Sequence, residues 1–350
     1  MIDRIKALID TLSSTHTLKA EEYLELIEGY TPEGAQYAAK IALSEKERIY
    51  GKAVYIRGLI EISNICKNDC YYCGIRKSNK NCSRYRLTVD EILNCCRHGY
   101  GLGFRTFVLQ GGEDGYFTDE VLVPLIESIK SEFADCAVTL SLGERSRESY
   151  EKLYKAGADR YLLRHETADC DHYSFLHPDN LNLYDRMQCL CDLKEIGFQV
   201  GCGFMVGSPG QKNDHIAKDL KFIEEFSPHL CGIGPFIPHK DTEYADLSAG
   251  SVDICCYLLS IIRIMKPSIL LPATTALGTL SDNGREKGIL SGANVVMPNL
   301  SPEDAKKKYT LYDNKLTSGA ESAEALSVLK ERISKIGAEV VSHRGDYKFI

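Results

Sequence analysis

Three cysteines stand close together near residue 70 in the spacing C-x3-C-x2-C. They are Cys66, Cys70 and Cys73, and the aromatic residue Tyr72 directly precedes the last of them. A strand-like apolar run over residues 55–63 leads into the polar loop that carries them. So short a loop brings the three sulfur atoms within a few ångströms of a common point. The spacing therefore predicts that the three thiolates hold one metal centre.

The number of ligands limits which centre can form. A structural zinc ion takes four protein ligands, and the next cysteine, Cys82, lies nine residues beyond Cys73 with basic residues between them. A [4Fe–4S] cluster is held by cysteine thiolates, and three of them would leave one iron open to a substrate or cosubstrate. We therefore favour a cluster with an open iron. A zinc loop and three independent reduced thiols are the alternatives.

The composition limits the partners and the location of the chain. Its 350 residues are 44% hydrophobic and carry a formal net charge of −7, so its overall charge gives no reason to expect nucleic acid or an anionic membrane as partner. The longest apolar run, residues 252–265, is too short to cross a bilayer. Fourteen scattered cysteines without a preceding secretory signal favour a reducing, cytoplasmic and anaerobic setting.

Short apolar runs alternate with amphipathic helical stretches from residue 54 onward. This alternation predicts a parallel sheet with helical crossovers, and the count of eight strands favours closure into a (β/α)8 TIM barrel over an open, doubly wound sheet. We expect residues 1–50 to form a helical cover, residues 51–310 the barrel, and residues 311–350 a helix and a strap. The predicted strands are residues 54–63, 106–112, 137–143, 160–166, 200–207, 231–237, 269–274 and 293–299.

Reactive residue types collect where these strands end, which is where α/β barrels carry their chemistry. The second strand ends in a Gly-Gly turn that contains Gly112, and the next residue, Glu113, could hold an ammonium group. In the fourth strand, the alternation of side chains puts Arg164 and Glu166 on the inner face and His165 on the helix-packed face. Ligand binding by this arginine and glutamate competes with the alternative of a buried structural ion pair.

Polar residues also occur within the predicted strands, where a barrel interior is ordinarily filled by branched apolar side chains. We infer a hollow, hydrated and partly cationic cavity that suits a small anionic substrate. Arg164 suits a carboxylate of a bound ligand. Arg186, early in the helix after the fourth strand, could reach the same ligand carboxylate. His239, after the sixth strand, is expected to be exposed. The polar strand residues are Arg57, Thr139, Ser141, Thr274 and Thr275.

The cysteine triplet with its penultimate aromatic residue resembles the signature of the radical S-adenosylmethionine (SAM) superfamily. Together with the other segments it resembles, more specifically, the [FeFe]-hydrogenase maturases of the HydE family, in order over residues 50–312. The most specific matching runs are RHET at residues 164–167 and PATT at residues 272–275. Further matching runs are YIRGLIEISNIC, YYCGIRKSN, RYRLT, VLQGGED, VTLSLGE, MVGSPGQ, GIGPFIPH and GANVVMPN.

The resemblance implies a radical SAM enzyme that helps to build the diiron subsite of [FeFe] hydrogenase. It implies that Cys66, Cys70 and Cys73 bind a [4Fe–4S] cluster whose open iron chelates SAM. In this family the substrate is a small organometallic unit, one iron carrying cysteine, carbon monoxide and cyanide, supplied by the maturase HydG. The product passes to the scaffold protein HydF, and a reductant such as ferredoxin or flavodoxin donates the electron.

The resemblance also implies roles for individual residues. The substrate cavity would be lined by Arg57, Thr139, Arg164, Thr274 and Thr275, which with the three cysteines are the candidate catalytic residues. Met205 stands in the isoleucine place of a G-x-I-x-G element that packs the adenine of SAM. The candidate cofactor-binding residues are Tyr72, Gly112, Glu113, Ser141, Glu166, Arg186, Met205 and Gly207.

One feature departs from the family pattern. Some members hold a second iron–sulfur cluster with cysteines that follow a Tyr-x-Leu-Tyr segment, and here residues 309–312 form that segment but no cysteine follows. We therefore predict a single cluster. Two other radical SAM reactions are alternatives: the lysine mutase that makes methylornithine, and biotin synthase-like sulfur insertion. A non-catalytic iron–sulfur carrier is the alternative of another class, although a carrier has no need of a SAM site.

Overall fold

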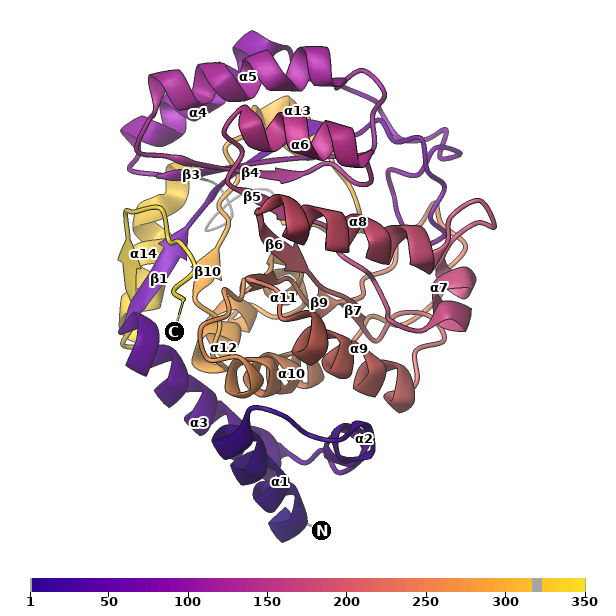
Figure 1. Ribbon diagram of the computed structural model, residues 1–350, viewed down its shortest axis with the longest axis vertical. Helices are drawn as coiled ribbons and strands as arrows, with labels where there is room; N and C mark the ends of the chain where they lie inside the picture. Colours follow the sequence, from indigo (N-terminus) through magenta and orange to yellow (C-terminus); the bar gives the residue numbers. More distant parts are fainter. Residues whose placement is uncertain (1, 317–322, 350) are drawn as a thin grey trace.

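Parallel strands form the centre of the molecule, and helices surround them (Figure 1). The computed structural model describes residues 2–316 and 323–349. Six strands lie side by side in one sheet, and every neighbouring pair is parallel. In order across the sheet they are β2 (Gly58–Ser63), β3 (Thr106–Gly111), β4 (Ala137–Ser141), β5 (Arg160–Leu162), β6 (Gln199–Cys202) and β8 (Leu230–Cys231).

Further parallel pairings close this sheet into a barrel. Leu230 of β8 pairs with Leu270, and Pro272 pairs with Val295 of β10 (Val295–Val296). Strand β10 in turn pairs with β1 (Ala53–Ile56), which leads through one residue into β2. The predicted (β/α)8 barrel is therefore confirmed, and the open, doubly wound sheet is wrong.

The strands are shorter than the sequence predicts because their ends bend into loops. The fifth and sixth predicted strands each break in the middle, so that β7 (Met205–Val206) and β9 (Gly234–Pro235) pair only with each other. Gly203 makes one of these breaks possible, since its φ of 152° and the carbonyl of Gly232, 2.1 Å from where a Cβ would lie, exclude a side chain. These bends open the carboxyl end of the barrel.

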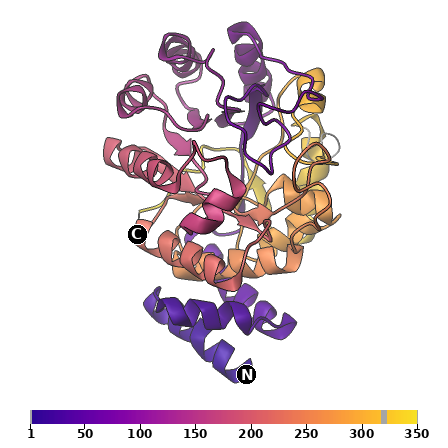
Figure 2. The ribbon, with the colours of Figure 1, turned by 90° about the vertical axis from the view of Figure 1, so that its right-hand side faces the viewer.

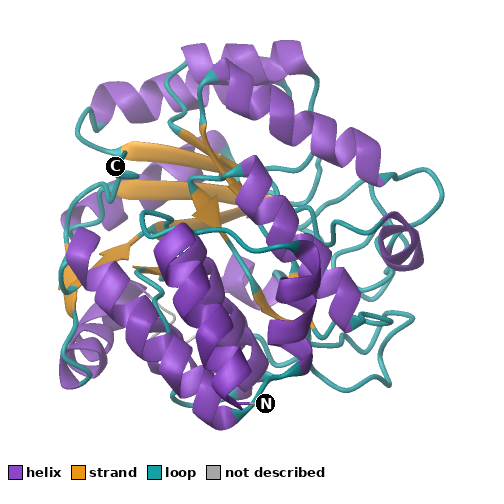
Figure 3. Cartoon of the chain, turned by 60° about the horizontal axis from the view of Figure 1, so that its bottom comes forward, coloured by secondary structure: helices purple, strands orange, loops and turns teal. Residues whose placement is uncertain are grey.

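Helices pack around the barrel and bury their apolar faces against it (Figure 3). In α5 (Asp119–Glu132) the buried residues Leu122, Leu125, Ile126 and Ile129 repeat at helical spacing and join the same core as the strand residues. In the described parts of the chain, no helix has the length and apolarity to cross a membrane. The other helices around the barrel are α4 (Val89–Gly101), α6 (Arg147–Lys155), α7 (Cys170–Leu176), α8 (Leu183–Ile196), α9 (Asn213–Phe226), α10 (Val252–Met265), α11 (Thr275–Leu280), α12 (Gly284–Leu290), α13 (Glu303–Lys308) and α14 (Leu326–Lys335).

Three helices precede the barrel: α1 (Ile2–Thr15), α2 (Ala20–Glu28) and α3 (Pro32–Tyr50). They pack against α9 and α10 at one end of the molecule (Figure 2). Thr31 caps α3, because its hydroxyl oxygen accepts a hydrogen bond from the backbone N–H of Gly34 at 3.1 Å and Pro32 follows it. We propose that residues 1–50 act as a cover on these two barrel helices.

The C-terminal tail closes the amino end of the barrel, where Figure 3 shows the C-terminus beside the central strands. Strand β11 (Glu339–Val341) pairs with the edge of β1 that β10 leaves free. Beyond it, the buried Arg160 donates hydrogen bonds to the carboxylate of Asp346 at 2.6 Å and to the carbonyl of Arg344 at 3.0 Å. The nearby Arg57 is also buried and reaches the Gly345 carbonyl at 3.5 Å.

Substitution of Asp346 by asparagine is expected to lower the free energy of unfolding by about 2 kcal/mol at neutral pH, because it leaves Arg160 buried without its counter-charge. Partial burial opposes ionisation of Asp346, but the hydrogen bond from Arg344 and the charge of Arg160 outweigh it, so the pKa of this carboxyl lies below its usual range. A depressed folded-state pKa stabilises the protein above the unfolded value and loses this contribution as the pH falls. The difference in unfolding free energy between the parent and the Asp346→Asn variant should therefore shrink below about pH 4.

Chemical denaturation at pH 7 and at pH 3.5 would measure this difference. The matched control is Asp253→Asn, since Asp253 pairs with Lys287 at 3.3 Å on the surface and is 66% exposed. We expect the control to change stability by less than about 1 kcal/mol. Equal losses of unfolding free energy in the two variants at neutral pH would show that Asp346 does not stabilise the packing of the C-terminal tail.

Candidate active site

The three cysteines lie on a folded loop, residues 64–87, that follows β2 and that we name the cysteine loop. Arg84 organises it from inside by donating hydrogen bonds to the backbone carbonyls of Asn64 at 2.6 Å, Ile75 at 2.7 Å and Asn79 at 3.1 Å. The side chain of Asn64 closes the loop by accepting from the Tyr85 N–H at 2.8 Å. The positions of the cysteines are thus fixed by polar contacts of their own loop.

Within the described chain, the cysteine side chains do not converge on one common point, although the short loop predicts that they should. Burial and the neighbouring thiols raise the pKa of Cys70, and burial together with Cys66 raises the pKa of Cys73 to about 12. Within residues 2–316 and 323–349, no three His, Cys, Asp or Glu side chains converge to hold one metal ion. A cubane is larger than an ion, and its own sulfides complete the coordination, so its cysteine ligands need not converge on one point.

Gly112 lets the end of β3 approach the cysteine loop. A Cβ at this position would lie 2.4 Å from the carbonyl oxygen of Ile65 and 2.8 Å from the Cβ of Cys66. Contacts of this length are not tolerated, so only glycine fits. The predicted Gly-Gly-Glu turn is therefore packed directly against the first cysteine.

Next to Cys73 and Tyr72, a cavity of about 320 Å³ opens at the carboxyl ends of the strands. We name it the inner cavity. Of the predicted site residues, it is lined by Tyr72, Cys73, Ser141, Arg164, Glu166, Met205, Thr274 and Thr275. Its other walls come from β9, α11 and the segment of residues 309–312. With Gln110 and Gly111 of β3 and Leu162 of β5, the structure thus brings residues from eight separate segments around one space.

Polar atoms in this cavity are left without hydrogen bonds. Arg164 and Glu166 approach each other at 3.3 Å, yet Nε and Nη2 of the arginine and Oε2 of the glutamate make no hydrogen bond within the described chain, nor does Oγ1 of Thr274. An unsatisfied buried polar group costs about 1–3 kcal/mol. Such atoms around an open space are expected where a polar ligand completes their bonding, which favours ligand binding over a purely structural ion pair.

The backbone of Glu166 is strained, which also indicates a ligand site. Its φ of 66° lies in the left-handed region, which non-glycine residues rarely adopt. Its N–H donates to the carbonyl of Gly203 at 3.0 Å, and the residue bridges to Phe204 on the neighbouring strand. Backbone strain of this kind clusters at ligand sites. Here it turns the Glu166 carboxylate into the inner cavity.

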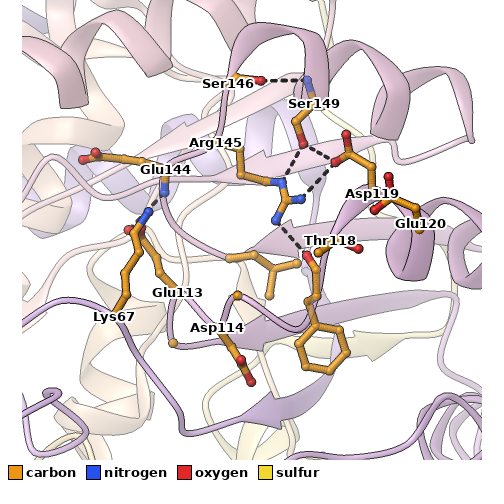
Figure 4. A pocket seen from close by; sticks show the side chains of 14 residues that line it. Lys67, Glu113, Asp114, Thr118, Asp119, Glu120, Glu144, Arg145, Ser146 and Ser149 are labelled. Atoms are coloured by element: carbon orange, nitrogen blue, oxygen red, sulfur yellow. Dashed lines mark hydrogen bonds and ion pairs between the residues drawn. The ribbon is translucent and has the colours of Figure 1, made fainter.

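A second cavity of about 350 Å³ lies beside the Gly-Gly-Glu turn and is shown in Figure 4. The protein itself occupies the arginine in its wall, although Oε2 of Glu113 makes no hydrogen bond in the described chain and only pairs with Lys67. Arg145 donates to the Asp119 carboxylate at 2.9 Å, to the Ser149 hydroxyl at 2.7 Å and to the Phe117 carbonyl at 3.0 Å. Because this arginine is fully used by the protein, we place the chemistry in the inner cavity instead.

Glu113 and Arg186 do not line the inner cavity. Glu113 accepts the N–H of Glu144 at 3.1 Å and pairs with Lys67 at 3.0 Å (Figure 4). Arg186 is buried, pairs with the Glu144 carboxylate, and donates to the backbone carbonyl of Arg164 at 2.9 Å. The sequence reading missed Glu144, although it follows a glycine just beyond β4, much as Glu113 follows Gly112 just beyond β3.

Three other candidates lie away from this space. Thr139 is buried below it in β4, and Arg57 contacts the C-terminal tail. Gly207, with φ of 72°, packs against Gly250 rather than on the cavity wall. A ligand role for these three residues stays a prediction.

The two histidine predictions have opposite outcomes. His165 faces the helices as predicted: it is fully buried, and its Nε2 lies 3.2 Å from the Asp219 carboxylate of α9. The prediction that His239 is exposed is wrong, because this residue is 3% exposed. It lies against Gly74 of the cysteine loop, and its Nε2 is 3.9 Å from the Asp313 carboxylate.

A histidine that the sequence reading missed orients Tyr72. His177 Nδ1 lies 2.9 Å from the carbonyl of Tyr173, so this nitrogen carries the hydrogen, and Nε2 accepts from the Tyr72 hydroxyl at 3.3 Å. Burial lowers the pKa of His177 to about 4, which keeps it neutral. The aromatic wall beside Cys73 is thereby held in one position. No spacing in the sequence connects residues 72 and 177, so no sequence signal could have found this contact.

Comparison with known proteins agrees with this geometry. The Radical SAM superfamily profile matches residues 60–223. The [FeFe] hydrogenase maturase subunit HydE of Thermotoga maritima is 42% identical over 298 residues, which cover 85% of each chain. This chain belongs to the HydE family of radical SAM enzymes.

More distant relatives share the length and fold of this HydE family member. The 3-methylornithine synthase of Methanosarcina barkeri is 25% identical over 90% of this chain and 89% of its own. The crystal structure of methylornithine synthase (PylB) superposes with a TM-score of 0.82 at 24% identity, over 95% of this chain and 97% of that one. That likeness shows the barrel fold.

Membership of the HydE family confirms the predicted enzyme class, and it implies a [4Fe–4S] cluster and SAM as cofactors. The interpretation as a non-catalytic carrier is set aside. A methylornithine synthase is the weaker alternative, because its sequence is much less similar to this chain than that of the HydE relative.

Proposed function

We propose that this protein is a cytoplasmic, anaerobic maturase that acts in assembly of the diiron subsite of [FeFe] hydrogenase. It would work alongside HydG and HydF, on a small organometallic unit with one iron, cysteine, carbon monoxide and cyanide. The observation that carries the proposal is the inner cavity, in which Arg164, Glu166 and Thr274 present polar atoms without hydrogen bonds next to Cys73. The T. maritima relative, named [FeFe] hydrogenase maturase subunit HydE, supports it.

The cofactor set follows from the cysteine loop. Cys66, Cys70 and Cys73 would hold one [4Fe–4S] cluster, and the absence of any cysteine after Cys256 supports a single cluster. When bound and reduced, the cluster supplies the electron that cleaves SAM to methionine and a 5′-deoxyadenosyl radical. The protein contributes the position of the reactants and the exclusion of water.

SAM and the substrate would share the inner cavity. The Glu166 carboxylate can accept hydrogen bonds from ribose hydroxyls, and Tyr72 and Met205 offer apolar walls for the adenine. The free N–H groups of Arg164 suit a carboxylate or a cyanide nitrogen of the substrate, with the hydroxyl of Thr274 as a further donor. A volume of about 320 Å³ admits small molecules but not a protein segment.

Reconstitution under anaerobic conditions tests the proposal. The reduced protein with SAM and the iron–cysteine–carbonyl–cyanide substrate is expected to release 5′-deoxyadenosine at a rate that depends on the substrate. Equilibrium dialysis should show SAM binding to the reconstituted protein. Turnover of lysine and SAM to methylornithine would instead establish the mutase, and failure to bind SAM would exclude any radical SAM function.

A further inference from the structure

A basic surface lies beside the cysteine loop, although the whole chain has a net charge of −7. Three segments contribute to it: residues 76–84, 238–243 and 306–314. Together they contain eight Lys and Arg residues and three Asp and Glu residues; of the eight, Lys306 is buried and Arg84 is bonded inside the cysteine loop. We name these three segments the basic face.

Hydrogen bonds join the three segments into one surface. Asp313 donates its N–H to the carbonyl of Pro238 at 3.0 Å, and its carboxylate accepts the N–H of Lys240 at 2.8 Å. Asn81 donates to the carboxylate of Asp241 at 2.8 Å. A hollow of about 370 Å³ between the segments is lined in part by Asn81, Lys240, Lys307 and Lys308. Segments more than 200 residues apart in sequence thus form one continuous face.

The acidic residues of the basic face are engaged by the protein, whereas most of its lysines are free. Glu243 pairs with Arg76 at 3.4 Å, and both aspartates accept the bonds just described. Lys77, Lys80 and Lys240 are exposed, and no ion pair involves them within residues 2–316 and 323–349. Lys307 is 63% exposed and has only a 3.4 Å contact with Glu303 on its own helix. Four lysines of the face are therefore exposed against one exposed acidic residue, Glu243, so the face presents net positive charge to the solvent.

Only a thin layer separates this face from the cysteines. Gly74 directly follows Cys73, and its N–H donates to the carbonyl of Leu311 at 2.9 Å. A Cβ on Gly74 would lie 2.2 Å from the carbonyl oxygen of Thr310 and 2.3 Å from Cδ2 of His239. Residues of the second and third segments of the basic face therefore rest directly on the cysteine loop. The opposite side of Cys73 borders the inner cavity, where SAM and substrate would bind.

We propose that the basic face docks an acidic one-electron carrier protein, with an iron–sulfur or flavin centre, that reduces the cluster. This inference rests on the proposed function and assigns its electron entry site. One electron passes from the reduced carrier to the oxidised [4Fe–4S] cluster, with no bond or proton exchanged. Because electron transfer weakens steeply with distance, the carrier must approach where the covering layer is thin. Opposite charges on the two proteins accelerate and orient such an encounter.

The test is a charge-reversal variant of three exposed lysines, Lys80→Glu, Lys240→Glu and Lys307→Glu, with an acidic [2Fe–2S] ferredoxin as the probe. The matched control reverses Lys40, Lys155 and Lys330, which are exposed on α3, α6 and α14. Fluorescence anisotropy with labelled ferredoxin is expected to show binding about 30-fold weaker for the basic-face variant only. Added salt should weaken binding to the parent, and stopped-flow reduction of the cluster by reduced ferredoxin should slow in parallel.

Each outcome decides for or against the basic face. Parent-like binding by the basic-face variant, or equal losses in both variants, would overturn the proposal. So would equally tight binding of a DNA oligonucleotide, because the face would then recognise any polyanion. Dithionite should reduce both variants at the parent rate, since it needs no docking. If dithionite with SAM gave no 5′-deoxyadenosine in the parent, the proposed function would fail, whereas the anisotropy data would still judge the docking.

Discussion

Replacing Cys70 with alanine is expected to abolish the iron–sulfur cluster and, with it, cleavage of SAM. If the three cysteines are the ligands of a cubane, the two that remain cannot hold it. After anaerobic reconstitution, iron should fall from about four atoms per chain to fewer than about one. Release of 5′-deoxyadenosine should fall more than about 100-fold, since even the loss of outer contacts to a metal ligand can cost that much.

Cys82 provides the matched control on the same loop. It is half-buried like the three proposed ligands, but its Sγ contacts only the Asn64 side chain, at 3.5 Å, among the hydrogen bonds of the described chain. Cys82→Ala should keep iron, sulfide and SAM cleavage near parent values. If it lost its metal together with Cys70→Ala, and the metal were zinc, a four-cysteine zinc site would replace the cluster.

The strands and helices of the barrel could be predicted because each is a local pattern. Apolar runs of six to ten residues marked the strands, and the amphipathic stretches between them marked the helices. The alternation in the fourth strand placed both Arg164 and His165 on their observed sides. His239 lies after β9, where no period applies. Its burial depends on Gly74 of the cysteine loop and on Asp313, contacts that only the tertiary structure shows.

Alternation predicts the face of a strand but not the depth of a residue in the barrel. Arg57 and Arg164 were both assigned to one hollow, and the structure separates them: Arg57 lies at the amino end under the tail, whereas Arg164 lines the inner cavity. The tail could not be foreseen, because β11 pairs with a strand almost 300 residues earlier. A polar strand residue therefore signals a buried partner or ligand without identifying which.

Glu61 is a charged residue within a predicted strand, and its position alone indicated that it needs a buried partner. It lies in β2 in the same alternation phase as Arg57, and it is fully buried. The structure gives it two partners, the side chain of Lys315 and the Asn299 amide, the latter at 2.9 Å. This buried pair ties residues 309–316 across the mouth of the barrel, where Tyr309 lines the inner cavity. An inward-facing carboxylate should have been read as needing a cation, but its partner lies 254 residues away.

Arg164→Met should weaken binding of the organometallic substrate about 100-fold while changing SAM binding far less. Methionine keeps most of the volume of the side chain but removes the guanidinium donors, whose Nε and Nη2 have no other hydrogen bond in the described chain. Hydrogen bonds to charged groups contribute about 1.5–3 kcal/mol each, so the loss of one or two gives this factor. The substrate affinity of Arg164→Lys should lie between those of the parent and of Arg164→Met, because a lysine keeps the charge but not the planar arrangement of donors. Anaerobic dialysis of substrate and of SAM would measure both affinities separately.

The outcome also decides between a ligand site and a structural ion pair for Arg164 and Glu166. If the 3.3 Å contact between them is structural, Arg164→Met should lower the melting temperature and leave the affinity for substrate unchanged in the protein that stays folded. If it is a ligand site, the affinity should fall with little change in melting temperature, since the free protein already leaves these atoms without hydrogen bonds. Arg97→Met on α4 is the control: Arg97 is 50% exposed and pairs with Glu132, so its loss should affect neither quantity by a comparable amount. Because the cavity is expected to choose its substrate by charge, a substrate analogue without the cysteine carboxylate should bind the parent protein as weakly as the true substrate binds the variant.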